Sequence, residues 1–398
     1  MRHGGRTPQR VLITGMGVVS AAGANVPETL ATFAAAIRHV GRITVFETSL
    51  DLPAFEVRCA LPAAVSAARS RTLLLAGHAL TEALADARLA PDFAALRVGV
   101  AMGTTVACQL NDLAFYAAWR NCGETPLAPV ERYLQGNLAA ALAAQTGATG
   151  PRVTVANACS SSADAIGVAL SWLRAGRCDL VLAGGADELN RVPVCGFRAL
   201  SVYSPEPCRP FDRDRRGLNL GEGAAVLVLE TEDSARRRGV TAAVELSGYG
   251  AACDAHHLTA PRPDGSGLEE AIRRSLLDAG VTPADIDFTN AHGTATHDND
   301  LVEAGTLARL FGAEARVLST KGYTGHTLGA AGALEAAFAA LALREGWLPP
   351  SAGFAQCDPD LALGALTQRT AVRGRHALST SLAFGGNNAA LVLSRHGA

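Results

Sequence analysis

Short apolar segments alternate with helix-like segments along most of this chain, and this alternation is the feature that most restricts its fold. Apolar runs of strand length occupy residues 11–14, 98–101, 180–183 and 224–230, and glycines follow several of them. Helix-like segments such as 163–175 separate the runs. Near-continuous apolar strands that alternate with helices are typical of a mostly parallel sheet with both faces covered. The sequence therefore predicts an α/β fold.

The second half of the chain repeats this style. Its predicted strands and helices occupy residues 244–248, 268–279, 288–291, 303–311, 317–320, 327–344, 376–381 and 389–394. A chain of 398 residues is long for a single core. We therefore expect two similar, closely packed halves, at residues 1–240 and 241–398.

The overall composition excludes several classes of protein. Hydrophobic residues make up 48% of the chain and charged residues 18%, so a large core can form and disorder is not expected. The net charge of -2 gives no reason to expect nucleic acid or an anionic membrane as a partner. No apolar run approaches the length of about 18 residues that a membrane helix needs, and no apolar signal core precedes residue 11. We expect a cytoplasmic protein.

Cysteine and lysine usage are both informative. The nine cysteines include no CxxC pair, which argues against a disulfide framework or a zinc ribbon. Lys321 is the single lysine among 35 lysines and arginines. Lysine has a compact, rotatable ammonium, whereas arginine has a wide planar fork. A lone lysine in this background suggests a site where a guanidinium cannot substitute, although one surviving surface lysine would give the same count.

Cys159 is the first candidate catalytic residue. It follows a strand-like segment and stands at the start of a predicted helix, in the sequence NACSSSADAIGVAL. A helix N-terminus offers free N–H groups and a positive partial charge, which lower the pKa of a thiol and can hold an oxyanion. The alternative is a buried structural cysteine, the usual state of a free thiol.

His292 is the second candidate. It ends an apolar strand and precedes Gly293, and catalytic side chains gather at strand ends in α/β sheets. A structural histidine is the alternative. His297 follows at a His-x4-His spacing, but convergence on a metal ion would need a helix, which Gly293 and the nearby threonines disfavour.

Two later segments complete the set of motifs. STKGYTGHTLGAAGALEA places Lys321 and His326 in a strand–turn–helix pattern, and the small residues at 329–332 would let the helix pack closely. The alternative is a packing helix with an incidental lysine and histidine. FGGNNAALVLS, which begins at Phe384, predicts a tight glycine turn that enters a strand. Its backbone N–H groups could form an oxyanion site, and a plain loop is the alternative.

Together these ordered motifs resemble the β-ketoacyl-[acyl carrier protein] synthase family, in its elongating Cys-His-His branch (the type I/II group). The resemblance covers nearly the whole chain. VLITGMGVVSAAG is similar to the opening strand and turn of the family, and PFDRDRRGLNLGEGAAVLVLE and GYGAACDAHHLTAPRPDGSG match family blocks in position and order. HGTATHDND and KGYTGHTLGAAG resemble ketosynthases of secondary metabolism, such as aryl polyene or reducing type II polyketide systems.

The resemblance implies a thiolase-like fold, in which two related α/β halves form five layers, α-β-α-β-α. It implies an acyltransferase that joins an acyl-thioester primer to malonyl-[acyl carrier protein] by decarboxylative Claisen condensation, in fatty acid or type II polyketide or polyene biosynthesis. No metal or redox cofactor is implied. The implied partners are an acyl carrier protein with its phosphopantetheine arm, malonyl and acyl thioesters, and a second subunit, in a homodimer or in a heterodimer with a chain-length-factor-like protein.

The resemblance also implies a role for each catalytic candidate. Cys159 matches the nucleophile that accepts the acyl group. His292 and His326 match the histidine pair that stabilises the enolate of the malonyl half-reaction. Lys321 matches the lysine that organises the site, through His326 and nearby charge.

Three further residues match binding positions of the family. Phe384 matches the gating phenylalanine, whose backbone N–H would join that of Cys159 in the oxyanion hole. Thr294 and Thr296 match the threonines that meet the phosphopantetheine arm.

The chain departs from the family pattern at several of these motifs. The family often has DTACSSS where Asn157 stands, HGTSTPxGD where His297 and Asn299 stand, and FGFGGTN where Leu382 and Asn387 stand. Leu382 and Asn387 fall beside the expected gate, so the acyl-chain preference is expected to differ from that of housekeeping fatty acid synthesis.

Four other interpretations stay open at the level of sequence. A non-catalytic chain-length factor would lack the nucleophile, which is present here as Cys159. A thiolase would use a second, late cysteine, for which Cys357 is the candidate. The initiating Cys-His-Asn branch would have asparagine in place of His326. A metal-dependent hydrolase could use a cluster of ligands formed by Asp254, His256 and His257.

Overall fold

The computed structural model describes residues 9–61, 70–89, 96–105, 113–128, 130–131 and 137–397. Its first five long strands form one half of a sheet, in the order β5-β4-β6-β7-β1. These strands are β1 (Val11–Ser20), β4 (Val98–Gly103), β5 (Arg152–Val155), β6 (Leu180–Asp187) and β7 (Gly223–Thr231). Strands β6 and β7 are buried along their whole length, which explains their near-continuous apolar sequences.

The next five strands form the other half, in the order β10-β9-β13-β14-β8. They are β8 (Val244–Cys253), β9 (Ile286–Asn290), β10 (Val317–Leu318), β13 (His376–Ala383) and β14 (Asn387–Arg395). If the five strands of each half are numbered in the order in which they occur along the chain, both halves have the strand order 3-2-4-5-1. The two halves therefore share one topology, and a single residue pair, Leu12 with Glu245, joins β1 to β8.

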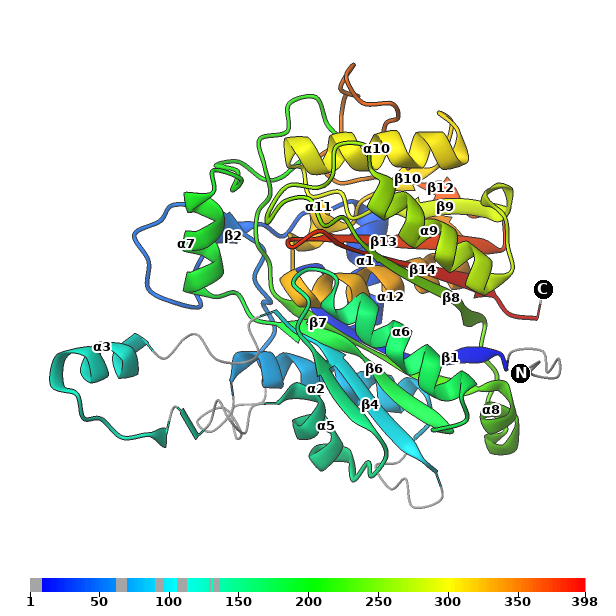
Figure 1. The fold of residues 1–398 in the computed structure, drawn as a ribbon, viewed down its shortest axis with the longest axis horizontal. Coiled ribbons are helices and arrows are strands. Elements are labelled where there is room, and N and C mark those ends of the chain that lie inside the picture. The colour runs from blue at the N-terminus through cyan, green and yellow to red at the C-terminus, as the bar shows by residue number, and fades with distance from the viewer. Residues whose placement is uncertain are drawn as a thin grey trace.

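Helices cover the outer faces of the two half-sheets and also lie between them (Figure 1); the half-sheets are called the first and second sheet below. Helices α2 (Arg71–Asp86) and α5 (Leu138–Thr146) lie on the outer face of the first sheet, and α9 (Ser266–Ala279) and α10 (His297–Phe311) on the outer side of the second. Helices α6 (Ser161–Arg174) and α12 (Ala331–Glu345) lie between the sheets. This α-β-α-β-α order confirms the five predicted layers.

Small residues bring the two central helices together. Thirteen residues of α12 are buried, most of them alanines. A Cβ atom added at Gly332 would lie 2.8 Å from Cβ of Ala163 on α6. The close packing predicted for the small residues of this helix is therefore confirmed at Gly332.

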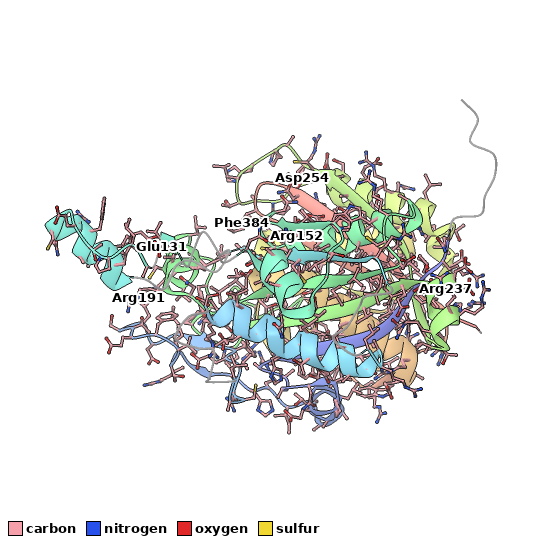
Figure 2. The ribbon with its side chains drawn as sticks, turned by 90° about the horizontal axis from the view of Figure 1, so that it is seen from below. Glu131, Arg152, Arg191, Arg237, Asp254 and Phe384 are labelled. Carbon is pink, nitrogen blue, oxygen red and sulfur yellow. The ribbon has the colours of Figure 1, made fainter. Side chains whose placement is uncertain are left out.

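Several further helices and strands complete the two halves. They are α1 (Val26–Ala35), β2 (Gly41–Arg42), β3 (Pro53–Ala54), α3 (Leu113–Cys122), α7 (Arg191–Ala199), α8 (Glu232–Arg238), the 3-10 helix Pro283–Asp285, α11 (Lys321–Thr324), the 3-10 helix Leu328–Ala330, β11 (Trp347–Leu348) and β12 (Thr370–Ala371). Figures 1 and 2 show α7, which begins at Arg191, and α8, which contains Arg237, at opposite ends of the molecule.

The predicted strand direction was wrong. Among the described strands of the large sheet, five of the nine neighbouring pairs are antiparallel and four are parallel. An apolar run indicates burial on both faces, but it does not specify the direction of the neighbouring strand. The tight turn at 384–386 makes β13 and β14 an antiparallel hairpin, and such a turn reverses the chain without a crossover helix.

No helix within the described ranges is long and apolar enough to cross a membrane.

Candidate active site

Cys159 lies in a constrained turn between β5 and α6. Its thiol is buried, and the residue before it, Ala158, has φ of +49°, a left-handed conformation that is uncommon for a residue with a side chain. The Ser161 hydroxyl donates to the Ala158 carbonyl at 2.6 Å and accepts from the Asn157 N–H at 2.7 Å. These hydrogen bonds hold the turn that places Cys159 at the N-terminus of α6.

A second group of hydrogen bonds ties this turn to the other half of the molecule. Asp164, in the first turn of α6, accepts from the Asn157 amide at 2.6 Å and from the Ser160 hydroxyl at 2.8 Å. Its other oxygen accepts from the Tyr249 hydroxyl of β8 at 2.8 Å. Gly167 leaves room for the Tyr249 ring, because a Cβ atom there would lie 2.5 Å from it. Asn157, a departure from the family pattern, is thus part of the support for the nucleophile turn.

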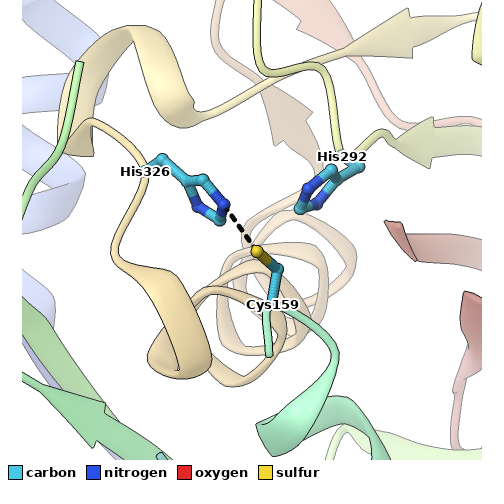
Figure 3. Close-up of side chains that lie close together, drawn as sticks. All are labelled: Cys159, His292 and His326. Atoms are coloured by element: carbon cyan, nitrogen blue, oxygen red, sulfur yellow. Dashed lines mark hydrogen bonds between the residues drawn. The ribbon is translucent and has the colours of Figure 1, made fainter. Parts of the chain in front are cut away.

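His326 lies beside Cys159. Its backbone is held on both sides by a neighbouring segment, because its N–H donates to the Asn219 carbonyl and its carbonyl accepts from the Gly221 N–H. Its Nε2 atom is 3.0 Å from Cys159 Sγ (Figure 3). Its Nδ1 atom is buried and has no hydrogen-bond partner among the described residues, so neither neutral tautomer is fixed.

His292 completes the cluster from the second sheet. It follows β9 by two positions, and its ring faces the His326 ring with centroids 5.2 Å apart and planes at 88° (Figure 3). The backbone N–H groups of His292 and Gly293 donate to the two oxygens of Glu303, at 2.8 and 2.7 Å. A buried carboxylate on α10 therefore fixes the loop that carries His292.

Lys321 lies behind His292 and is fully buried. Its ammonium is 3.1 Å from His292 Nδ1 and donates to the His292 carbonyl at 2.6 Å. The expected contact with His326 was therefore wrong, because the side chain of Lys321 meets the other histidine. It also forms an ion pair with Glu335 of α12. An ammonium can only donate, so Nδ1 of His292 accepts and the proton of this imidazole lies on Nε2, the atom toward the cavity.

The electrostatics of the cluster follow from its burial. Burial, followed by the charge of Lys321, lowers the pKa of His292 and of His326 well below the usual value, so both imidazoles are neutral at pH 7. Burial raises the pKa of the Cys159 thiol to about 12, although Lys321 and a hydrogen bond from the Phe384 backbone oppose the shift. The lowered thiol pKa expected from the helix N-terminus was wrong, because desolvation outweighs the favourable charges.

Phe384 lies at the tight turn between β13 and β14, on the open side of Cys159. Its ring stacks on Phe197 of α7 with centroids 5.3 Å apart, and Phe197 lies 6.5 Å from the His326 ring. Gly385 and Gly386 have φ of +86° and +78°, conformations that glycine adopts without strain. The turn therefore brings both the ring and the backbone N–H of Phe384 to the thiol.

A cavity of about 570 Å³ connects the cluster with the surface. Cys159, both histidines, Phe197 and Phe384 line it. Thr294 and Thr296 line it too, and their hydroxyl oxygens are 2.8 Å apart. Further lining residues include Arg215, Arg216, Asp254, His257, His297, Asn299, Leu382 and Asn388.

Two family models match most of the chain. The model for the N-terminal domain of β-ketoacyl synthases matches residues 61–235, and the model for the C-terminal domain matches residues 243–355. The chain is 32% identical to a 3-oxoacyl-[acyl-carrier-protein] synthase 2 of Staphylococcus aureus (strain N315), over 97% of this chain and 98% of the relative. This chain belongs to the β-ketoacyl synthase family.

Solved structures of this family share the whole fold. The ishigamide ketosynthase/chain length factor superposes with a TM-score of 0.93 and 33% identity, over 98% of this chain and 100% of the other. A complex of a type II polyketide synthase acyl carrier protein with its ketosynthase, bound to the hexaketide, contains a chain that superposes with a TM-score of 0.88 and 26% identity, over 98% and 100%. This β-ketoacyl synthase is an acyltransferase that condenses an acyl thioester with malonyl-[acyl carrier protein].

Sequence reasoning missed two buried carboxylates of the ketosynthase site, Glu303 and Glu335. Burial raises the pKa of Glu335 to about 7, although Lys321 opposes the shift. Burial also raises the pKa of Glu303. A signal was present for Glu335, because it is the one charged residue in the otherwise apolar stretch 329–343. A buried charge is rare unless it is paired, and the lone lysine was the obvious partner.

Several residues of the competing interpretations lie elsewhere. Cys357 is exposed and does not line the cavity of this ketosynthase. Asp254 accepts hydrogen bonds from the Asn388 amide and the Arg262 N–H, and His256 and His257 are exposed. These contacts make Asp254 part of the structure around the gate.

The cluster of Cys159, His292 and His326 is the one group of described residues with the donor set of a metal site. The ligand atoms of Cys159, His292 and His326 lie within 4.8 Å of one another. A sulfur and two imidazole nitrogens suit a soft divalent ion such as zinc, provided that the thiol is deprotonated. The same geometry suits a thiol nucleophile with two neutral hydrogen-bonding imidazoles, which is the chemistry of the family.

Proposed function

We propose that Cys159 is the acyl-accepting nucleophile of this ketosynthase and that His292, His326 and Lys321 serve the malonyl half-reaction. The observation that supports these roles best is the cluster itself, with a thiol 3.0 Å from one neutral imidazole and a second neutral imidazole fixed by a buried ammonium. Phe384 is proposed to gate the site, and Thr294 and Thr296 to contact the phosphopantetheine arm.

Acyl transfer begins with a neutral thiol, because burial keeps the proton on Cys159. As the sulfur attacks the thioester carbonyl, its proton passes to Nε2 of His326. The backbone N–H groups of Cys159 and Phe384 stabilise the tetrahedral oxyanion. The bond to the carrier thiol then breaks, and that thiol leaves with the proton held by His326. The acyl group ends on Cys159 in a new thioester, so bond energies are nearly balanced.

Decarboxylation of the malonyl thioester follows. The bond to the carboxylate breaks, carbon dioxide leaves, and the electron pair becomes an enolate. His326 now carries its proton on Nε2, as His292 does, since no hydrogen-bond partner among the described residues holds the proton on its Nδ1. The enolate oxygen accepts hydrogen bonds from the Nε2–H groups of both imidazoles, and the charge of Lys321 adds to the stabilisation. The enolate carbon then attacks the acyl carbonyl on Cys159, the carbon–sulfur bond breaks, and the Cys159 sulfur takes up one proton from solvent. Both imidazoles must be neutral donors in this step, which is consistent with their lowered pKa values.

An acyl carrier protein is the proposed donor of both thioesters. The cavity joins the thiol to the surface, so it offers a flexible arm a path to the buried nucleophile. Exposed apolar side chains lie at Leu200, which lines the cavity, and at Leu258, next to its lining residue His257. Arg216 lines the cavity and Arg262 follows the lining residue Pro261; both are exposed and suit an acidic partner.

A second subunit is proposed to pack against the β5 end of the sheet. β5 is the last strand in the sheet order, and its Val153, Thr154 and Val155 are only half-buried, so it offers a strand edge for pairing. Helix α3 projects from the body, and its Tyr116 and Trp119 are each 50% exposed (Figure 1). Such an apolar surface favours a homodimer or a heterodimer with a chain-length-factor-like subunit.

The proposed pathway is fatty acid or type II polyketide synthesis. The first is supported by the curated relative and the second by the structural neighbours. The division into units 1–240 and 241–398 is proposed as the boundary between the two halves.

Intact-protein mass spectrometry tests the nucleophile directly. The protein is mixed with a panel of acyl carrier proteins that bear saturated and polyunsaturated chains. A mass gain of one acyl group is expected, and it should be absent in Cys159→Ala, which should keep the melting temperature of the wild type. Acylation that persists in Cys159→Ala would refute the assignment. No gain with any donor, alone or with a chain-length-factor-like partner, would favour the non-catalytic interpretation.

A further inference from the structure

Asp187 is a fully buried carboxylate at the C-terminal end of β6, outside the proposed catalytic set. Its Oδ1 atom accepts a hydrogen bond from the Thr104 hydroxyl at 2.6 Å. Its Oδ2 atom accepts from two backbone N–H groups, those of Thr105 at 2.8 Å and Gly329 at 2.6 Å. One carboxylate therefore joins the loop after β4 to the 3-10 helix Leu328–Ala330.

Each of these two segments lies next to one of the proposed reacting residues. The Thr105 hydroxyl donates to the carbonyl of Ala158 at 3.2 Å, and Ala158 precedes Cys159. Gly329 follows His326 by three positions, and the intervening Leu328 has φ of +54°. Ala158 and Leu328 both have left-handed conformations, and both are linked to Asp187, the first through Thr105 and the second through its neighbour Gly329. Such conformations persist only where the surroundings impose them.

The junction around Asp187 is tightly packed. A Cβ atom added at Gly329 would lie 2.6 Å from the Thr105 nitrogen and 2.8 Å from Asp187 Oδ2. A Cβ atom at Gly185 would lie 2.5 Å from Cβ of Ser162 and 2.7 Å from the Gly103 carbonyl oxygen. Neither glycine has room for a side chain, so the segments around Asp187 are in direct contact, and we expect a displacement of the carboxylate to shift its neighbours.

The charge of Asp187 works against the chemistry of the thiol. It raises the pKa of Cys159, in addition to the larger effect of burial. A buried carboxylate also loses its hydration, which is costly unless hydrogen bonds replace it. Electrostatic activation of the nucleophile therefore cannot be its contribution, and geometry is what its contacts provide.

We propose that Asp187 is a positioning residue for acyl transfer, which sets the distance between Cys159 and His326. It binds the segment that follows His326 and the Thr105 loop, which holds the residue before Cys159. The proposal rests on the proposed roles of Cys159 and His326 as nucleophile and proton acceptor. Asparagine at this position has one acceptor oxygen and one donor nitrogen, so it cannot accept all three hydrogen bonds. Displacements of about 1 Å at a reacting pair lower rates by as much as about 100-fold.

The test measures the single-turnover rate constant for acyl transfer to Cys159, together with the dissociation constant of the acyl carrier protein. Asp187→Asn and Thr105→Val are each expected to lower the rate constant about tenfold with the dissociation constant unchanged. Thr105→Ser keeps the hydroxyl and should retain a rate near that of the wild type. Asp179→Asn, a carboxylate at the other end of β6 that pairs with Arg97, is the matched control and should have no effect.

The double variant distinguishes a positioning role of Asp187 from a general loosening of the fold. If Asp187 acts through Thr105, Asp187→Asn combined with Thr105→Val should be no slower than Asp187→Asn alone, whereas independent effects multiply. Multiplying effects, or Asp187→Asn within twofold of the wild type, would overturn the proposal. Should Asp187→Asn not fold, equal rates for Thr105→Val and Thr105→Ser would overturn it. A wild type that is never acylated would instead show that the proposed function has failed.

Discussion

Lys321 offers the sharpest test of how this ketosynthase stabilises the enolate. Lys321→Met removes one positive charge from a fully buried position with little change in volume. The ammonium is 3.1 Å from His292 Nδ1. An enolate oxygen bonded to the far nitrogen of the same ring would lie about 8 Å from the ammonium, since a hydrogen bond adds about 2.8 Å beyond the ring.

The expected loss follows from this separation. Two unit charges about 8 Å apart interact by about 2 kcal/mol at an effective dielectric constant of about 20. Removal of that interaction from the transition state slows decarboxylation about 30-fold. His292 also loses the donor that fixes its tautomer, so a larger loss is consistent with the same argument. Lys321→Arg keeps the charge but must place a wider guanidinium in a filled site, and it should lose activity as well.

The assay follows carbon dioxide release from malonyl-[acyl carrier protein] without a primer, so that acyl transfer does not enter. Stability is measured in parallel, because Lys321→Met leaves Glu335 without its ammonium. The folded pKa of Glu335 is about 7 against an ordinary value of 4.5, and it should rise further in the variant. Since the folded pKa is raised, its contribution to stability is present below pH 4.5 and is lost as pH rises through the folded pKa, by up to about 1.4 kcal/mol per pH unit.

The double variant that combines Lys321→Met with Glu335→Gln provides the control. It should remove this pH dependence of unfolding but leave decarboxylation slow. Decarboxylation by Lys321→Met within threefold of the wild type would refute the proposed role of the ammonium. A free energy of unfolding that falls with pH equally in the single and double variants would refute the account of Glu335.

Two further predictions concern the thiol and the packing of α6. Glu335→Gln should lower the pKa of Cys159, because the Glu335 carboxylate helps to raise it. Iodoacetamide should therefore label the Cys159 peptide faster at each pH from about 8 to 10 in this variant than in the wild type or in the surface control Glu345→Gln. Equal labelling rates would contradict this prediction. Gly167→Ala should destabilise the fold by about 1–3 kcal/mol, because its Cβ would lie 2.5 Å from the Tyr249 ring of β8. The Cβ of Gly196→Ala would meet no atom within 4 Å, so this variant should stabilise α7 by about 0.5–1 kcal/mol. Urea denaturation measures both changes.

Much of the site could be predicted because its motifs are local. The strand-to-helix position of Cys159 and the strand-end position of His292 are visible in consecutive residues, and both lie where the pattern placed them. The lone lysine also proved informative, since Lys321 is fully buried and forms an ion pair with Glu335. The small residues before and within α12 were correctly interpreted as a packing surface.

The misses share a cause, which is that they depend on contacts between distant segments. Glu303 binds the His292 loop from α10, and Glu335 meets Lys321 from α12. Neither contact has a fixed spacing in the sequence. Asp187 is a further example, because its partners come from 104–105 and from 329.

The sequence by itself determined the alternation of strands and helices, the two similar halves and the candidates for the reacting side chains, because these depend on local pattern and residue chemistry. Only the tertiary structure decided the strand directions, the 3.0 Å approach of Cys159 to His326 and the raised pKa of the thiol. Desolvation and through-space charge depend on every group that surrounds an atom. They are therefore set only when the two halves close around it.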